Sequence, residues 1–287
     1  MNYCMENYTS FVTSTVRIMP LGDSVTSGQH GPRTSTPGSY RIQLWDNFVS
    51  DRLRVDFVGS LSNGPQELGD KDHEGNGAYA IHGLNNLIIE ESILSIHQPD
   101  IILLITGAND VIRNYSLNRM YTDLSNLIDT ITTQLPNVEL LVSSLTPLNP
   151  LIKGDRAANK ARDFNNLIPD LVEDKAAEGK NVIYVNAGGS LSVEDLATDG
   201  IHPSASGYDE LGDVWYQALL ENSADILLNG VRVRADVSQE TETLSFVEPE
   251  TSVFASSKTY LPFENNQGIV GFENGSFDSE SALPYLW

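Results

Sequence analysis

The 287-residue chain contains one cysteine, Cys4, which excludes an intrachain disulfide and a cysteine-based metal site. Basic residues are also few, since 17 Lys and Arg stand against 39 Asp and Glu, for a formal net charge of -22. Nucleic-acid binding requires a basic face that displaces counterions, so the composition argues against a nucleic-acid partner. The same charge disfavours acidic substrates and membrane surfaces, and a neutral substrate fits best.

Long hydrophobic runs are missing as well. No segment approaches the roughly 20 apolar residues that cross a bilayer, so no membrane partner is expected. The first residues, MNYCMENYTSFVTSTV, lack the basic and apolar regions of a secretory signal. A hydrophobic fraction of 40% is nevertheless typical of a globular protein with a sizeable core.

Short apolar runs, most of them rich in β-branched residues, predict five strands. They are Val16–Leu21, Val55–Ser60, Ile101–Thr106, Val138–Leu145 and Asn181–Asn186. Segments with helical spacing of apolar residues lie between and after them. They are Ser39–Arg52, Leu84–His97, Leu117–Gln134, Asp155–Gly179 and Ser204–Glu221. Strands that alternate with helices favour a parallel sheet, and the predicted fold is a three-layer, doubly wound α/β/α domain.

The pattern changes near the C-terminus, where acidic and hydroxyl residues dominate and the helical period is lost. We therefore expect three parts: an N-terminal extension over 1–15, a folded domain over 16–225, and an acidic C-terminal extension over 226–287. The sequence assigns no role to the last part.

Polar residues follow three of the predicted strands. Ser24 comes after the first strand in GDSVTSG, Asn109 after the third in GAND, and the pair Asp199 and His202 after the fifth in DGIHP. Each motif alone also suits a structural role, as a strand-to-helix turn, an Asx turn or a helix cap. Ligands of open α/β sheets bind outside the carboxyl ends of the strands, so the occurrence of all three motifs there favours a catalytic site.

The residue types at this edge indicate nucleophilic catalysis. A serine hydroxyl such as that of Ser24 attacks when a positioned base removes its proton. His202 is the predicted base because imidazole titrates near neutrality, and Asp199 is predicted to fix its tautomer. The Asn109 amide and the Ser24 N–H are predicted to donate to a developing oxyanion.

These blocks carry a resemblance to a known family. GDSVTSG, GAND and DGIHP are similar to the blocks of the SGNH (GDSL-like) hydrolase superfamily. Within it, RIMPLGDSVTSG, PGSYR, VDFVGS and DHEGNGAYAI resemble carbohydrate esterase family 3, the acetyl xylan esterases, and the similarity covers residues 16–222.

The resemblance implies a flavodoxin-like core of five parallel strands and a hydrolase catalytic domain. It implies Ser24 as nucleophile, His202 as base, Asp199 as its orienting partner and Asn109 as oxyanion donor. It also implies that no cofactor is required, and it suggests an extracellular protein.

One block departs from the family pattern. The second oxyanion glycine ordinarily precedes an aromatic residue, but here Ala78 precedes Tyr79, and Gly77 lies one residue earlier. The donor is a backbone N–H, so Ala78 serves if its dihedral angles permit. If a positive φ is required, either the loop shifts to use Gly77 or activity is reduced.

The acidic segment Asp70–Gly75 invites a metal hypothesis. Its oxygens alternate as in a calcium loop, but Ile81 stands where an EF-hand requires Glu. A different calcium site remains an alternative, and an acidic rim of the active site is the favoured interpretation. We assign no metal ligand.

The predicted function is a serine esterase that removes acetyl or other short acyl groups from a polysaccharide such as acetylated xylan, or from a small ester. The alternatives are a lipid or short-chain ester hydrolase of the same superfamily, or a non-catalytic carbohydrate-binding protein on a decayed hydrolase fold. Tyr40, Trp45 and Tyr79 are aromatic candidates for the rim, although core packing is the favoured role for Trp45. The oligomeric state stays open.

Overall fold

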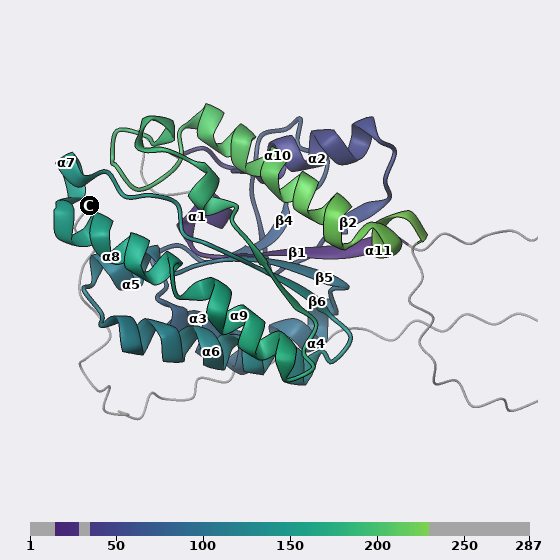
Figure 1. Ribbon diagram of the computed structural model, residues 1–287. Helices are drawn as coiled ribbons and strands as arrows, with labels where there is room; N and C mark the ends of the chain where they lie inside the picture. Colours follow the sequence, from purple (N-terminus) through teal and green to yellow (C-terminus); the bar gives the residue numbers. More distant parts are fainter. Residues whose placement is uncertain (1–14, 29–34, 230–287) are drawn as a thin grey trace, which may run out of the picture. The chain divides into compact units, whose positions relative to one another are not determined.

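The computed structural model describes residues 15–28 and 35–229 (Figure 1). They belong to the first of two units into which the chain divides, Met1–Arg232, and the second, Val233–Trp287, lies outside the described residues. Of the predicted extensions, only residue 15 and residues 226–229 are described.

All five predicted strands are present and run parallel in one sheet. They are β1 (Val16–Gly22), β2 (Val55–Phe57), β5 (Ile101–Ile105), β6 (Glu139–Ser143) and β7 (Val182–Val185). Two further short strands are β3 (Leu61–Ser62) and β4 (Asp72–Gly75). The order is β3-β4-β1-β5-β6-β7, and β2 also pairs with β1, so the sheet has seven strands rather than five. It is parallel apart from the β3–β4 pair.

Strand β4 corrects the expectation that the acidic segment forms a rim loop. Glu74 is fully buried, and its carboxylate accepts hydrogen bonds from the Ser60 N–H and the Asn76 side chain, both at 2.8 Å. The Asp70 carboxylate accepts from the Phe57 N–H at 2.7 Å. These carboxylates therefore hold neighbouring backbone segments in place.

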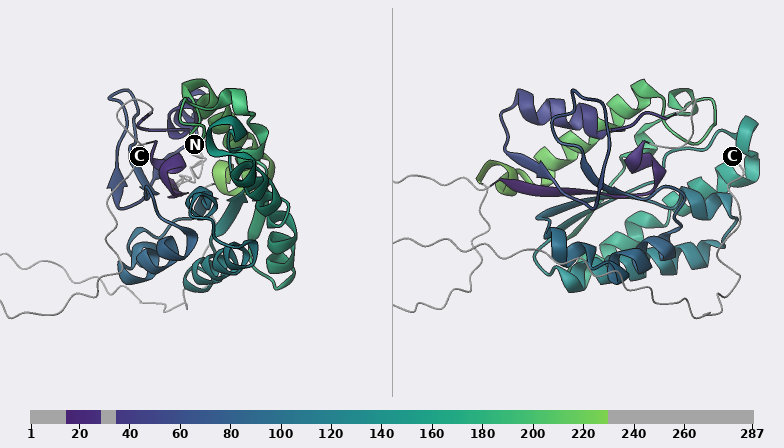
Figure 2. Two further views of the ribbon diagram at one scale, coloured as in Figure 1. Left: turned by 90° about the vertical axis from the view of Figure 1, so that its left-hand side faces the viewer. Right: turned by 180° about the vertical axis from the view of Figure 1, so that it is seen from behind.

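Helices cover both faces of the sheet, which confirms the three-layer prediction (Figure 1, Figure 2). On one face lie α2 (Arg41–Ser50) and α10 (Ala205–Asn222), and on the other α3 (Ile81–Glu90), α6 (Leu117–Gln134), α8 (Asp155–Asn165) and α9 (Ile168–Ala177). Shorter helices are α1 (Ser24–Ser27), α4 (Ile93–His97), α5 (Ala108–Ile112), α7 (Pro150–Lys153) and α11 (Ala224–Asn229). Two 3-10 turns, Gly188–Ser190 and Val193–Asp195, precede the loop that leads to α10.

Two of the predicted helices are interrupted. The segment predicted as Leu84–His97 forms α3 and α4, which are separated at Ser92, a residue with a left-handed φ of 55°. The segment predicted as Asp155–Gly179 forms α8 and α9. Pro169 stands in the first turn of α9, where its missing N–H costs no hydrogen bond, and this favours a new helix start.

A hydrophobic core fills each side of the sheet. The core beneath α2 and α10 contains Tyr40 and Trp215, both fully buried, so Tyr40 is not a rim residue. Trp45 packs on Phe57, with ring centroids 5.5 Å apart. Ile226 in α11 joins the same core, so the predicted boundary at 225 falls inside a packed helix. Within the described ranges, no helix combines the length and apolar character of a membrane span.

Candidate active site

Ser24 lies at the carboxyl end of β1, held by a tight turn into α1. A Cβ on Gly22 would lie 2.0 Å from the Ile105 carbonyl oxygen, so only glycine lets β1 end this close to β5. Asp23 then caps α1, and its carboxylate accepts the Val25 N–H at 3.0 Å. Ser24 is half-buried in the first turn that follows.

The structure brings three predicted site residues into one hydrogen-bonded chain. Ser24 Oγ lies 2.7 Å from His202 Nε2, although the two residues are 178 positions apart. His202 Nδ1 lies 2.8 Å from Asp199 Oδ2. The other carboxylate oxygen of Asp199 accepts the backbone N–H groups of Ile201 and His202, at 2.9 Å and 3.0 Å. The imidazole therefore has one nitrogen on a carboxylate and the other on the serine.

The turn that carries the histidine is tied down on both sides. The Ala197 N–H donates to the His202 carbonyl at 2.8 Å, and the Asn149 N–H donates to the Gly200 carbonyl at 2.9 Å. Gly200 has a φ of 69°, the left-handed conformation that glycine adopts without strain. These backbone contacts set the distance between Asp199 and the strand ends.

Asn109 lies next to this chain because β5 is the neighbour of β1 in the sheet, with Ile105 paired to Gly22. It follows Gly107, which caps α5 with a φ of 124°. Its side-chain nitrogen is buried and has no hydrogen-bond partner among the residues described. A buried amide donor without an acceptor is unfavourable, so this position is suited to an acceptor from a bound molecule.

The turn Asn76–Tyr79 lies on the other side of β1, directly after β4. The Asn76 N–H donates to the Gly22 carbonyl at 2.8 Å, and the Tyr79 N–H closes the turn on the Asn76 carbonyl at 3.3 Å. Ala78, the third residue of the turn, has a φ of 65°. A positive φ there is typical of a type II turn and normally requires glycine. Ala78 has thus adopted the glycine conformation, and Gly77 is not among the positive-φ residues.

Helix α5 connects Asn109 to the Ala78 turn. Arg113 donates to the Ala78 carbonyl at 2.7 Å, and Asp110 Oδ2 accepts the Ile81 N–H at 3.1 Å. Burial raises the pKa of the Asp110 carboxyl to about 6. Neither Arg113 nor Asp110 was predicted from the sequence, where the available signal was that both closely follow Asn109 in GANDVIR.

Asp23, directly after β1, interacts electrostatically with residues that follow β5. Burial raises its pKa to about 6, although the Val25 N–H and the backbone of Gly107 and Ala108 partly stabilise the anion. The other carboxylate oxygen, Oδ2, is buried and has no hydrogen-bond partner among the described residues. The sequence indicates Asp23 only as part of a turn, whereas in the structure it is a buried acidic group next to Ser24.

Side chains from α3, α5 and α6 form a cluster of potential metal ligands. The ligand atoms of His82, Asp110 and Asp123 are within 4.8 Å of one another. Arg119 already contacts two of them, with 3.3 Å to Asp123 and 3.3 Å to His82. The guanidinium therefore balances the carboxylate charge of this cluster.

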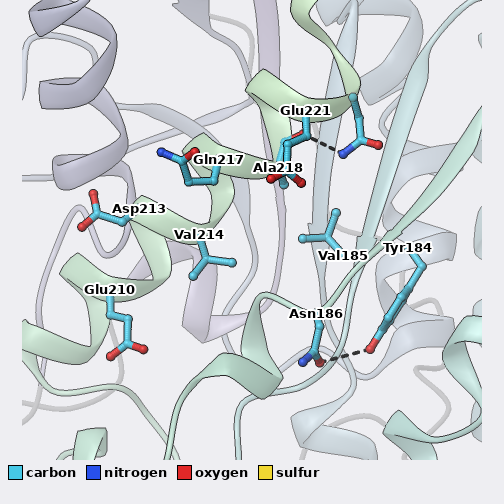
Figure 3. A pocket seen from close by; sticks show the side chains of 10 residues that line it. Tyr184, Val185, Asn186, Glu210, Asp213, Val214, Gln217, Ala218 and Glu221 are labelled. Atoms are coloured by element: carbon cyan, nitrogen blue, oxygen red, sulfur yellow. Dashed lines mark hydrogen bonds between the residues drawn. The ribbon is translucent and has the colours of Figure 1, made fainter.

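Two surface cavities lie near the domain's helices. One, of about 430 Å³, runs between β7 and α10 and is acidic (Figure 3). Its wall includes Glu210, Asp213 and Glu221, and Tyr184 donates to Asn186 at 3.1 Å within it. The other, of about 230 Å³, lies between α5, α7 and α8 and is basic.

Residues 18–215 match the family described as GDSL-like Lipase/Acylhydrolase. The chain belongs to this family. This membership confirms the predicted resemblance to the GDSL-like hydrolases.

Two curated relatives of this GDSL-like hydrolase are longer proteins. The multidomain esterase of Ruminococcus flavefaciens is 30% identical over 232 residues, which is 73% of this chain and 29% of the relative. The putative endoglucanase X of Acetivibrio thermocellus is 34% identical over 131 residues, 45% of this chain and 53% of the relative. The chain thus spans about a third to a half of these relatives.

Two solved structures of carbohydrate esterases are similar to this chain. The family 3 carbohydrate esterase of Clostridium thermocellum is 36% identical, with a TM-score of 0.62, and the match covers 75% of this chain and 98% of that one. A family 3 carbohydrate esterase from Talaromyces cellulolyticus, 22% identical with a TM-score of 0.63, shares the fold. The GDSL-like hydrolase fold is therefore confirmed for this chain.

Proposed function

We propose that this GDSL-like hydrolase is a serine esterase that removes acetyl groups from a polysaccharide such as acetylated xylan. The observation that carries the proposal is the chain from Ser24 through His202 to Asp199, beside the unpartnered amide of Asn109. Similarity to a family 3 carbohydrate esterase supports a carbohydrate ester as substrate. The resemblance to carbohydrate esterase family 3 suggests an extracellular protein, and we propose that the enzyme acts outside the cell.

In the first half-reaction, Ser24 Oγ attacks the ester carbonyl carbon while its proton passes to His202 Nε2. The Nδ1–H of His202 donates to Asp199, which stabilises the imidazolium that forms. The tetrahedral oxyanion accepts hydrogen bonds from Asn109 Nδ2 and from the backbone N–H groups of Ser24 and Ala78.

The intermediate then collapses. The bond between the carbonyl carbon and the sugar oxygen breaks, and His202 Nε2 gives its proton to the departing sugar hydroxyl. Ser24 is left as an acetyl ester. In the second half-reaction His202 takes a proton from water, the resulting hydroxide attacks the acetyl carbon, and Ser24 regains its proton as acetate leaves.

We assign the second backbone donor to Ala78 rather than Gly77. The support is the φ of 65° at Ala78, which is the conformation that glycine brings to this position of a type II turn. The proposal therefore requires no shift of the loop that would bring the Gly77 N–H into the site. Alanine in place of the family's glycine strains the turn, but the backbone N–H of residue 78 is still available as a donor.

Hydrolysis of p-nitrophenyl acetate, butyrate and octanoate by the wild type and Ser24→Ala tests the proposal, followed by acetate release from acetylated xylan. We expect a preference for acetate, release from xylan, and loss of both activities in Ser24→Ala. Ser95→Ala, at an exposed serine in α4, is the matched control. A preference for octanoate indicates a lipid hydrolase. Equal rates for the wild type and Ser24→Ala indicate a non-catalytic carbohydrate-binding protein.

A further inference from the structure

The basic cavity between α5, α7 and α8 stands out in an acidic protein. Its wall holds three cations, Lys153, Arg156 and Lys160, and no acidic residue. The whole chain has 17 Lys and Arg against 39 Asp and Glu. The cavity therefore has a local charge opposite in sign to the net charge of the chain.

These cations have no anionic partner. Across residues 15–28 and 35–229, no carboxylate pairs with any of the three, and the side chains of Lys153 and Arg156 make no hydrogen bond. The Lys160 ammonium donates to the Asn114 side chain and to the Tyr115 carbonyl, which are both neutral. Burial and the nearby Arg156 charge lower the pKa of Lys160. Mutually repelling cations around a hollow favour an anion between them.

Two residues of the cavity wall lie on, or pack against, elements that also hold the proposed catalytic residues. Ile112 in its wall lies three residues after Asn109 in α5, and residues at this spacing share a side of a helix. Ile152, also in its wall, packs on the turn that holds Asp199, since a Cβ on Gly200 would lie 2.9 Å from Ile152 Cβ. Helix α8 lies beside both α5 and α7 (Figure 1).

We propose that this cavity is a subsite for a sugar carboxylate, so that the substrate is an acetylated polysaccharide that carries uronic acid residues. This inference rests on the proposed function. The Arg156 guanidinium suits a bidentate contact with a carboxylate, while Lys153 and Lys160 act as point charges. Ile112 and Ile152, 46% and 49% exposed, offer an apolar surface to a sugar ring. The volume of about 230 Å³ is below the roughly 300–1,000 Å³ of sites for drug-sized ligands, so it suits one sugar residue.

The inference refines the conclusion drawn from composition. A net charge of -22 predicts a neutral substrate, because it describes the field of the whole chain. At a distance, an anionic polymer interacts with the net negative charge of the whole chain. At contact, it interacts mainly with the cations of the cavity. Beyond the Debye length of about 10 Å at 0.1 M salt, the distant charges are screened, and the local cations decide binding.

The test compares acetyl release from acetylated glucuronoxylan with release from acetylated xylan that lacks uronic acid. The double variant Lys153→Gln/Arg156→Gln removes the two unpaired cations in the full-length chain. We expect the ratio of the two kcat/KM values, acidic over neutral polymer, to fall about tenfold or more. Arg54→Gln is the control, because Arg54 is exposed and precedes β2 at the opposite end of the sheet. It is expected to keep the wild-type ratio.

An unchanged ratio in the double variant overturns the inference, as does an equal fall in Arg54→Gln. If the wild type deacetylates neither polymer, the proposed function fails, and binding tests the cavity directly. Sodium glucuronate, glucose and sodium sulfate are then titrated against the wild type and the double variant by NMR. Glucuronate binding that the double variant loses supports the subsite. Absence of glucuronate binding, or equal binding of sulfate, overturns it.

Discussion

In the proposed mechanism, the side of the site that holds the nucleophile and the side that holds the oxyanion donors differ in how many of their polar groups already have hydrogen-bond partners. From Ser24 Oγ to the Asp199 carboxylate, each contact is a hydrogen bond of 2.7–3.0 Å. On the oxyanion side, the buried Asn109 amide has no partner among the described residues, and Ala78 has a left-handed backbone. The nucleophile side is therefore complete in the resting protein.

The oxyanion side becomes complete when an acceptor arrives. A donor that is unsatisfied in the free enzyme and satisfied by a charged oxygen stabilises the transition state more than the ground state. Variants on the nucleophile side are therefore expected to lower kcat most, and loss of the Asn109 amide is expected to lower kcat without lowering the stability of the fold.

The largest expected effect is on the nucleophile side. Asp199→Asn is expected to lower kcat on p-nitrophenyl acetate about 10⁴-fold, because an amide facing His202 Nδ1 favours the wrong imidazole tautomer. Asp195→Asn, a half-buried capping residue of the same loop, is the control and is expected to keep wild-type kcat. A loss below tenfold for Asp199→Asn would contradict the assigned role.

On the oxyanion side, Asn109→Ala is expected to lower kcat about 10²–10³-fold with little change in KM. The fold is not expected to be destabilised, because the variant removes a buried donor without a partner. Kinetics with p-nitrophenyl acetate and thermal unfolding together check this split. A raised KM at constant kcat would assign Asn109 to ground-state binding instead.

Asp110, the neighbour of Asn109, is expected to make the free energy of unfolding depend on pH. Burial raises its folded-state pKa from 3.8 to about 6, so its ionisation destabilises the fold as the pH rises through that range. Its contribution to stability is full below about pH 4 and is lost above about pH 6. Asp110→Asn keeps an acceptor for the Ile81 N–H and is expected to raise the free energy of unfolding by up to about 3 kcal/mol at pH 8.

Urea unfolding of the wild type and Asp110→Asn at pH 4 and pH 8 checks this expectation. The gain should be absent at pH 4, where the wild-type carboxyl is protonated in the folded state. Asp174→Asn, an exposed residue in α9, is the control. An equal gain at both pH values would show that ionisation of Asp110 is not its cause.

The smallest expected effect is at the strained turn. Ala78→Gly is expected to raise the free energy of unfolding by about 0.5–1 kcal/mol, because relief of the left-handed conformation exceeds the added entropy of the unfolded chain. Ala176→Gly, in the regular helix α9, should instead destabilise by a similar amount. Chemical unfolding measures both, and a destabilised Ala78→Gly would show that the turn is unstrained.

Features that depend on the local order of residues were predictable from the sequence alone. Apolar runs predicted five strands because a strand buried on both faces needs continuous apolar residues. The Asp199–His202 pair was predictable because the two residues are only three positions apart, within one turn. Ser24 was predictable because GDSVTSG follows the first apolar run at a strand end.

Only the tertiary structure decided what depends on long-range packing. The short, polar strand β4 exists through its pairing with β1 and β3, which no local pattern indicates. Tyr40 is buried because α10 approaches α2 closely at Gly212, where a Cβ would lie 2.7 Å from the Tyr40 carbonyl. The contact from Arg113 to Ala78 joins residues 35 positions apart. The basic cavity likewise exists only where three helices meet, because net charge sums over the chain and packing decides which charges become neighbours.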